Sequence, residues 1–196
     1  MQDLTPSAAP LMPTALPSPW LLRWQRHFTA GQTALDLACG SGRHVRWLRE
    51  RGLQVCAVDR NAQALAGLAD CGAELIEADL EAAPWPLGSR RFDLVLVTNY
   101  LWRPLLPRVV EAVAPGGWLL YETFADGQQL LGRPARPEFL LRHGELLQAA
   151  GDLRIVGYED GFVDGDAHGV NPAQIQRVAA VRERTPGDLQ ARYHLS

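Results

Sequence analysis

Two glycines, Gly40 and Gly42, stand between a short apolar run and a segment with helical spacing. The run 34–37 predicts a strand and residues 43–51 predict a helix, so the glycines form a tight turn between them. Such a turn leaves unpaired backbone N–H groups at the start of the helix, and glycine lets a ligand approach the backbone closely. The sequence therefore predicts a site for a small polar ligand at this turn.

Acidic residues accompany this turn and the next two predicted strands. Asp36 precedes the glycines, Asp59 ends the predicted strand 53–58, and Asp79 ends the predicted strand 73–78. Asp59 is placed to accept both hydroxyls of a ribose, and the carboxylate of Asp36 could meet a cationic group. The three acids suit a ligand that carries an ammonium group, a ribose and an adenine amine, but no phosphate. S-adenosylmethionine (SAM) has this set of groups.

A nicotinamide cofactor is the alternative ligand for a glycine turn of this kind. Dinucleotide-binding turns read G-x-G-x-x-G, and their third glycine allows close packing of the helix on the strand. Val45 stands at that third position, and Asp36 would repel a pyrophosphate. The sequence therefore disfavours a nicotinamide-dependent dehydrogenase.

The pattern resembles the class I SAM-dependent methyltransferases, which carry D-x-G-x-G-x-G, an acid ending the second strand and an acid after the third. The resemblance covers roughly 34–124, including FDLVLVTNYLWRPLL and VAPGGWLLYETF, and it is greatest to the small tellurite-resistance-like methyltransferases of bacteria. It implies SAM as cofactor and S-adenosylhomocysteine (SAH) as product. The residues that it assigns to the cofactor are Asp36, Ala38 (in place of the first family glycine), Gly40, Gly42, Asp59, Asp79, Leu80 and Asn99.

The segment TNYLWR, residues 98–103, follows the central predicted strand. In the resembled family this position lines the space between the sulfonium methyl and the nucleophile. Asn99 can donate and accept hydrogen bonds, Tyr100 adds an aromatic wall with a hydroxyl, and Arg103 could hold an anionic substrate. The alternative is that Tyr100 only packs and that Arg103 is a surface charge.

Glu122 lies near the end of the predicted strand 118–124. It could take a proton from the nucleophile, or it could fix an arginine such as Arg103 or Arg133. Asn99, Tyr100 and Glu122 are thus the predicted catalytic residues. Insertions such as 126–142 form the acceptor wall in small methyltransferases, which the resemblance implies, whereas a solvated loop is the alternative. The predicted substrate-binding residues are Arg103, Tyr121, Arg133 and Phe139.

Strands alternate with helices along the chain, which indicates an α/β fold. We expect a Rossmann-like, seven-stranded, mostly parallel sheet with one antiparallel strand and helices on both faces, as the resemblance implies. The further predicted strands are 92–97, 118–124, 153–158 and 174–184. The predicted divisions are a flexible proline-rich arm (1–18), a methyltransferase domain (19–185) and a tail (186–196). A helix over 19–28 could cover the cofactor or pack on the sheet edge.

Composition excludes several classes of function. The 196 residues are 47% hydrophobic, which suffices for one core, and a net charge of −3 disfavours nucleic acid and anionic membranes as partners. No run is long enough to span a membrane. Three cysteines without metal-ligand spacing are typical of a reduced, cytoplasmic protein. We interpret Asp164, Asp166 and His168 as an exposed turn, and we predict no metal.

The predicted function is methyl transfer from SAM to a small-molecule acceptor by a monomer or weak dimer. One alternative is a module that binds SAM or SAH without turnover. A second is aminopropyl transfer from decarboxylated SAM, but that chemistry places paired acids where Thr98 and Asn99 stand. The acceptor itself is not predictable, because a sulfonium methyl requires no obligatory catalytic side chain.

Overall fold

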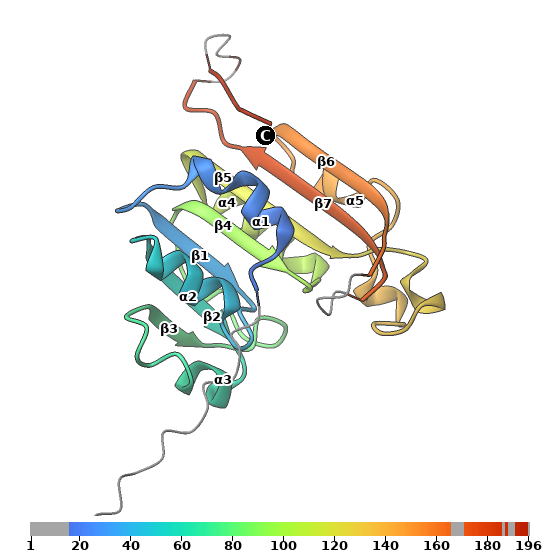
Figure 1. Cartoon of the computed structure of the whole chain (residues 1–196), viewed down its shortest axis with the longest axis horizontal. Helices are drawn as coiled ribbons and strands as arrows, with labels where there is room; N and C mark the ends of the chain where they lie inside the picture. Colours follow the sequence, from blue (N-terminus) through green and yellow to red (C-terminus); the bar gives the residue numbers. More distant parts are fainter. Residues whose placement is uncertain (1–15, 166–170, 186, 188–190, 196) are drawn as a thin grey trace, which may run out of the picture.

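A single seven-stranded sheet forms the centre of the molecule in the computed structural model, which describes residues 16–165, 171–185, 187 and 191–195. The strand order is β3-β2-β1-β4-β5-β7-β6, and only β7 runs antiparallel to its neighbours (Figure 1). The predicted fold class is therefore confirmed. The strands are β1 (Thr33–Leu37), β2 (Gln54–Asp59), β3 (Glu74–Glu77), β4 (Phe92–Thr98), β5 (Val113–Phe124), β6 (Arg154–Val163) and β7 (Ala173–Val181).

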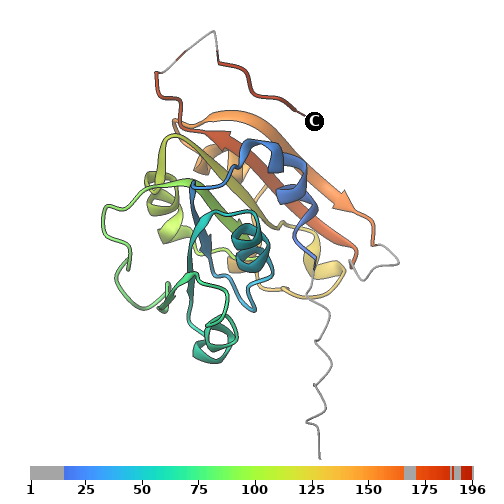
Figure 2. The same ribbon diagram turned by 60° about the vertical axis from the view of Figure 1, so that its left-hand side comes forward.

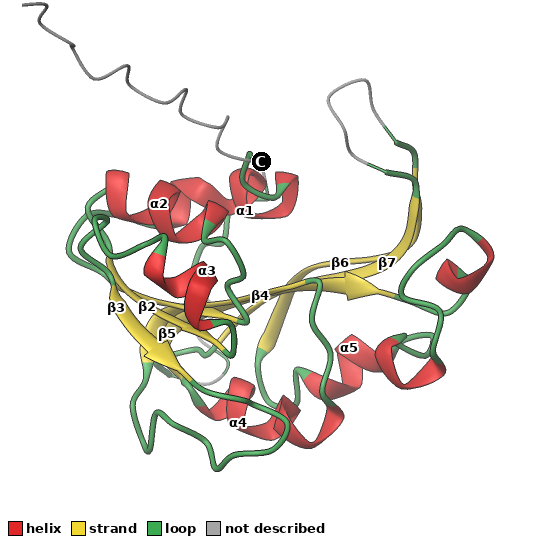
Figure 3. Ribbon diagram, turned by 90° about the horizontal axis from the view of Figure 1, so that it is seen from below, coloured by secondary structure: helices red, strands yellow, loops and turns green. Residues whose placement is uncertain are grey.

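Helices cover both faces of the sheet (Figure 3). One face carries α1 (Pro19–Trp24), α2 (Arg43–Glu50) and α3 (Ala62–Ala66), and the other carries α4 (Leu106–Glu111) and α5 (Glu145–Ala149). The short 3₁₀ helices are η1 (Gln25–His27), η2 (Arg103–Leu105), η3 (Gln128–Leu130) and η4 (Pro137–Phe139).

The central strand β4 shows why the sheet has two cores. Its residues Leu94, Val95, Leu96 and Val97 are all buried, and successive side chains point to opposite faces. Val95 and Val97 pack in the cluster under α4 and α5, whereas Leu94 and Leu96 pack in the cluster under α1 and α2. A continuous apolar run is what a parallel strand covered on both faces requires.

Some boundaries differ from the predicted ones. Strand β5 begins at Val113 instead of residue 118, and its pairing with β4 shifts between Phe92 and Leu94. Gly117 lies inside this irregularity, where a Cβ atom would overlap the carbonyl oxygen of Phe92. Glycine therefore permits this irregularity within β5. Strand β6 also extends to Val163, which lengthens the hairpin with β7.

Helix α1 packs on the sheet face over β5 and β7 (Figure 1). Ser18 caps it by accepting a hydrogen bond from the Trp20 N–H at 3.0 Å, and Trp20 Nε1 donates to the Val178 carbonyl at 3.1 Å. The ring of Trp24 lies 5.6 Å from that of Trp118. Of the two interpretations of this helix, packing on the sheet is the one that these contacts support.

The two ends of the chain are described in part. Most of the predicted arm, residues 1–15, lies outside the described residues, but Ser18 at its end is buried. From the predicted tail, Tyr193 makes an edge contact with Trp118 at 5.8 Å, and the His194 carbonyl lies 3.0 Å from His27 Nε2. The described part of the tail thus lies beside η1 and β5, on the side of the sheet that carries α1 (Figure 2).

The close packing of α1 on β6 predicts the effect of a substitution at Gly157. A Cβ atom there would lie 2.6 Å from the Trp24 ring, so Gly157→Ala should destabilise the fold by ~1–3 kcal/mol in urea denaturation. Gly161→Ala is the matched control on the same strand, because a Cβ atom at Gly161 meets nothing within 4 Å. Equal stability of the two variants would contradict this packing.

Candidate functional site

The glycine turn follows β1 at the carboxyl edge of the sheet. Gly40 has a φ of 55°, and its N–H donates to Asp59 Oδ2 at 2.8 Å. A Cβ atom on Gly40 would meet nothing within 4 Å, so the backbone borders open space at this position. This is the approach to the backbone that the sequence predicted for a ligand.

Gly42 is a glycine for a different reason. It is the N-cap of α2 with a φ of 78°, and a Cβ atom there would overlap the side chain of Leu68. Left-handed backbone and tight packing therefore account for Gly42, and Leu68 rather than open space lies on its Cβ side. A contact between Gly42 and the cofactor stays a prediction.

Ala38 carries a cost that the sequence alone does not reveal. Its φ is 55°, a left-handed conformation that costs a residue with a side chain about 1–2 kcal/mol. The conformation explains why the resembled family has glycine at this position. Alanine in place of the family's first glycine therefore strains the backbone at residue 38 and also adds a side chain there.

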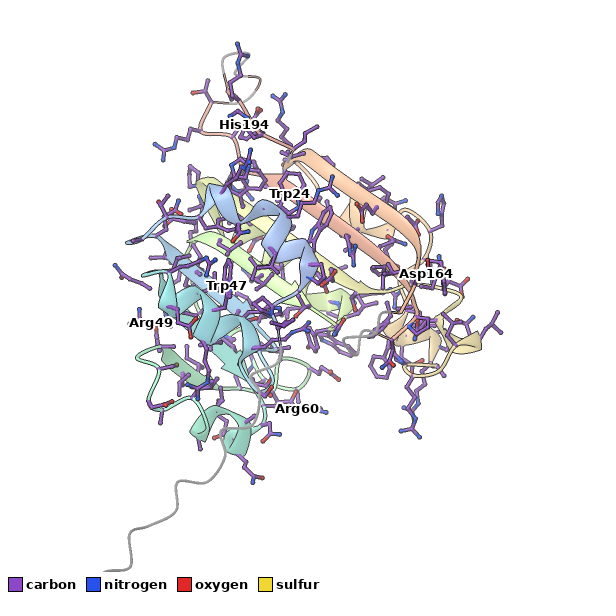
Figure 4. The ribbon with its side chains drawn as sticks, viewed as in Figure 1. Trp24, Trp47, Arg49, Arg60, Asp164 and His194 are labelled. Carbon is purple, nitrogen blue, oxygen red and sulfur yellow. The ribbon has the colours of Figure 1, made fainter. Side chains whose placement is uncertain are left out.

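A cavity of about 170 Å³ opens beside the turn, at the carboxyl ends of β1 and β2. Four predicted cofactor residues and one predicted catalytic residue line this cavity. Arg60, which follows β2, lines it as well (Figure 4). Arg60 was missed because an arginine after a strand is usually a surface charge. The lining residues are Ala38, Asp59, Arg60, Asp79, Leu80, Glu81 and Tyr100.

Two carboxylates of the cavity are held by backbone N–H groups. Besides the bond from Gly40, Asp59 accepts one from the Asn61 N–H at 2.8 Å through Oδ1. Asp79 Oδ1 accepts from the N–H groups of Glu81 and Ala82 at 2.9 and 3.2 Å. Each carboxylate oxygen has a second lone pair, so both groups are oriented and still able to accept hydrogen bonds from a ligand.

Asp36 differs from the prediction. It is fully buried, it does not line the cavity, and neither of its carboxylate oxygens has a hydrogen-bond partner within the described residues. Burial raises its pKa to about 7, although the positive charge of Arg43 acts in the opposite direction. The three acids therefore do not converge on one cavity, because Asp36 lies beneath the turn.

His44 is a buried neighbour of Asp36 that the sequence did not single out. Its Nε2 accepts the Ser18 N–H at 3.1 Å, so the neutral ring carries its proton on Nδ1, which faces Asp36 Oδ2 at 3.8 Å. Burial, and then the charge of Arg43, lower the pKa of His44 to about 3. A histidine in the first turn of a helix gives no sequence signal for such a role.

Asn99 and Tyr100 both lie at the end of β4, as predicted. Asn99 is exposed with a φ of 54°, and its N–H donates to the Glu122 carbonyl at 2.9 Å. Tyr100 lines the cavity with Asp59 and Asp79, and burial raises the pKa of its hydroxyl, which has no partner within the described residues. Tyr100 therefore lines the same cavity as the two carboxylates.

Glu122 is held in an ion pair. Its Oε2 lies 2.7 Å from Arg177 Nε, and its Oε1 accepts a hydrogen bond from the Ser18 hydroxyl. It does fix an arginine, but the partner is neither Arg103 nor Arg133. Both carboxylate oxygens are therefore engaged within the fold, and the catalytic role of Glu122 stays a prediction.

Arg103 and Tyr121 also have structural partners in place of a substrate. Arg103 pairs with both carboxylate oxygens of Glu145 at 2.7 and 2.9 Å, and it donates to the carbonyls of Glu138 and Leu140. The buried Tyr121 donates its hydroxyl to the Tyr100 carbonyl at 2.9 Å. Their polar groups therefore have partners within the protein, and the substrate-binding roles of both residues stay predictions, with Arg103 also lining a cavity of the segment after β5.

The segment after β5 forms a second cavity, about 430 Å³, lined by Arg103, Asp126, Pro137, Glu138, Leu140 and Arg142. Arg133 is exposed and Phe139 is half-buried in η4, and neither lines this cavity. A further cavity, about 410 Å³ and lined by Trp85 and Arg91 among others, lies at the amino end of β4. It is remote from the glycine turn and is not part of this site.

Within the described residues, no group of three or more potential metal ligands occurs, and no helix is long and apolar enough to cross a membrane. Asp166 and His168 of the predicted exposed turn lie outside the described residues, so their interpretation stays a prediction.

Residues 34–117 match the family model described as "Methyltransferase domain", and the chain has the fold of SAM-dependent methyltransferases. TehB from Haemophilus influenzae aligns with a TM-score of 0.62 and 20% identity over 78% of this chain and 58% of that one. A TehB-like SAM-dependent methyltransferase from Corynebacterium glutamicum aligns with a TM-score of 0.60 and 16% identity over 84% and 87%. These structures confirm the fold that the resemblance predicted.

Curated relatives match at higher identity over a shorter length. The chain is 36% identical over 98 residues to a malonyl-[acyl-carrier protein] O-methyltransferase of Enterobacter lignolyticus. The matched region covers 46% of this chain and 38% of the relative. The chain spans less than half the length of the curated relatives that it matches.

The buried Asp36 predicts a pH dependence of stability. Its pKa is 3.8 when unfolded and about 7 when folded, so the folded state binds more protons between these values and its stability falls as pH rises through that window. Asp36→Asn removes this effect. The free energy of unfolding of the variant, relative to the parent, should rise by ~1 kcal/mol per pH unit up to about pH 7 and then level off.

The measurement is urea denaturation of both proteins at a series of pH values. The opposite contribution of His44, whose pKa is lowered, is common to both proteins and cancels in the difference. A difference between the two proteins that does not change with pH would show that Asp36 ionises normally in the fold.

Proposed function

We propose that this chain is a SAM-dependent methyltransferase that transfers a methyl group to a small-molecule acceptor and releases SAH. The observation that carries the proposal is the hydrogen bond from Gly40 to Asp59 beside open space and a cavity. The match of residues 34–117 to a methyltransferase domain supports it independently.

The residues at the cavity fit the adenosyl part of SAM. The free lone pairs of Asp59 suit the two ribose hydroxyls, and Leu80 offers an apolar surface for the adenine. Asp79 and Glu81 give the mouth of the cavity a negative charge that repels phosphate. This donor set favours a positively charged nucleoside over a dinucleotide.

When bound, SAM supplies an activated methyl group, so the protein must orient the donor, admit a nucleophile in line with the sulfur and exclude water. The turn at Gly40 and the carboxylate of Asp59 orient the donor. The exposed Asn99, at the end of β4, is available to hydrogen-bond donor or acceptor. Because Glu122 is paired with Arg177, we infer an acceptor that needs no strong base, such as a thiolate, a soft oxyanion or an aromatic amine.

The acceptor side of the proposal rests on the segment after β5. Its cavity of about 430 Å³ has room for a small molecule, and the Arg142 guanidinium is available to an anionic one. Arg133 and Phe139 stay proposed contacts from the same segment. Two curated relatives are named for methylation of a malonyl-[acyl-carrier protein], which makes a carboxylate acceptor worth including in tests.

We also propose that residues 19–185 form one domain, and that the protein is a monomer or weak dimer without a nucleic acid partner and is located in the cytoplasm. The three unpaired cysteines, Cys39, Cys56 and Cys71, support the reducing compartment.

Calorimetry with SAH tests the donor site. The parent should bind SAH with a submillimolar dissociation constant, and Asp59→Asn should weaken binding roughly tenfold or more, because one acceptor for the ribose hydroxyls is lost. Asp70→Asn is the control, since Asp70 is exposed and pairs with Arg46 away from the cavity. Absence of SAH binding to the parent would rule out the proposed function.

Turnover separates the enzyme from a binding module. Incubation of the parent with SAM and a panel of thiol, metalloid oxyanion, amine and carboxylate acceptors should yield SAH with at least one of them. A chain that binds SAH tightly but forms none with any acceptor class would favour the non-catalytic alternative.

A further inference from the structure

A cavity of about 410 Å³ lies at the amino end of β4, where the loop 79–91 meets the end of α4. None of its described lining residues lines the donor cavity at the glycine turn or the cavity after β5. A volume of this size is typical of small-molecule sites, so the cavity has room for a ligand of its own. This amino-edge cavity is lined, among others, by Trp85, Ser89, Arg90, Arg91, Arg108 and Glu111.

Positive charge is concentrated in the lining of the amino-edge cavity. Arg90 donates to both carboxylate oxygens of Glu74, at 2.8 and 2.7 Å, and Arg108 pairs with Glu111 at 2.9 Å. Arg91 makes no hydrogen bond or ion pair within the described residues. Three guanidinium groups therefore meet two carboxylates, and one positive charge is left without a partner. Such a lining attracts an anion.

The end of α4 borders the same cavity, and its carbonyl groups are satisfied by an arginine from another element. Unpaired carbonyls at the end of a helix would carry a partial negative charge and repel an anion. Here Arg182, which follows β7, donates to the Val113 carbonyl at 2.9 Å and to the Val110 carbonyl at 3.0 Å. The positive character of the lining is therefore not offset by these two carbonyl groups.

Trp85 gives the cavity an aromatic wall. It is half-buried, packs against the apolar cluster under α4 and α5, and also lines the cavity. Ser89 is exposed in the same lining, and its hydroxyl can donate or accept a hydrogen bond. An indole near an unpaired guanidinium suits a flat ring that carries a negative charge, because the ring stacks on the indole and the charge pairs with the guanidinium.

We propose that the amino-edge cavity binds a small aromatic anion, that is, a flat ring with a carboxylate or a phosphate group. Arg91 pairs with the anionic group, Ser89 adds a hydrogen bond, and Trp85 stacks on the ring. A planar guanidinium matches carboxylate and phosphate oxygens equally well, so both groups belong to the proposed class. The site goes beyond the proposed methyl transfer and does not rest on it, because the two cavities share no described residue.

Calorimetry with four probes tests the site. The aromatic anions 1-naphthyl phosphate and 2-naphthoate carry a ring and a charge, inorganic phosphate carries only the charge, and 2-naphthol carries only the ring. One series of titrations uses the parent chain alone, and a second uses the chain saturated with SAH, so that the donor cavity is filled. In both series the aromatic anions should bind with dissociation constants of ~1 mM or below, and the other two probes roughly fivefold or more weakly.

Three variants locate the binding. Arg91→Gln should weaken the binding of both aromatic anions roughly fivefold or more, because it removes the unpaired charge. Trp85→Leu should weaken it roughly threefold or more, because stacking is lost. Arg26→Gln is the matched control, since Arg26 is an exposed arginine of η1 and does not line the cavity. Arg91 is exposed, so Arg91→Gln tests the site even if Trp85→Leu does not fold.

The outcomes separate this inference from the proposed function. If the parent does not bind SAH, the proposed function fails, and the series without SAH still tests the amino-edge cavity. Aromatic anions that bind only without SAH occupy the donor cavity, and that result would overturn the inference. No binding at ~5 mM, equal affinity for inorganic phosphate and 1-naphthyl phosphate, or unchanged affinity in Arg91→Gln would overturn it as well.

Discussion

The hydrogen bond from the Gly40 N–H to Asp59 is the interaction on which the site depends. At 2.8 Å it joins the turn after β1 to the end of β2, and the Asn61 N–H holds the other oxygen of the same carboxylate. The Asp59 side chain therefore holds the turn in place, and the same two hydrogen bonds orient its carboxylate toward the cavity. A carboxylate held by two backbone N–H groups cannot rotate freely, so it is organised before any ligand arrives.

The buried groups beneath the turn, in contrast, are unpaired or strained. Asp36 is without a hydrogen-bond partner, His44 is kept neutral, and Ala38 adopts a left-handed backbone conformation. Each of these features lowers the stability of the fold without a ligand. The two apolar clusters on either side of the sheet compensate for that loss. Strain and unpaired charge gathered at one turn are common at binding sites, where the ligand supplies the missing partners.

Local pattern was sufficient for the fold and for the four predicted cofactor residues that line one cavity, Ala38, Asp59, Asp79 and Leu80. The apolar run of β4 and the acid at the end of β2 could be read because their meaning depends on neighbours in sequence. The acceptor side could not be read in this way. Arg103 pairs with Glu145 and Glu122 pairs with Arg177, both across long stretches of chain. On the donor side, the contact between Gly42 and Leu68 could not be predicted for the same reason. A charged residue at a strand end looks the same in sequence whether it awaits a substrate or already has a partner. His44 was missed for the same reason, because its partner Ser18 lies in a different element.

The result is a molecule whose donor side is organised by backbone and carboxylates, while the polar side chains expected on the acceptor side brace the fold. A crystal structure of the chain grown with SAH tests this division most directly. The account predicts both ribose hydroxyls within hydrogen-bond distance, ~2.6–3.2 Å, of the Asp59 carboxylate, with the thioether above Gly40. Density for SAH at any other position, with the Gly40 turn unoccupied, would contradict it.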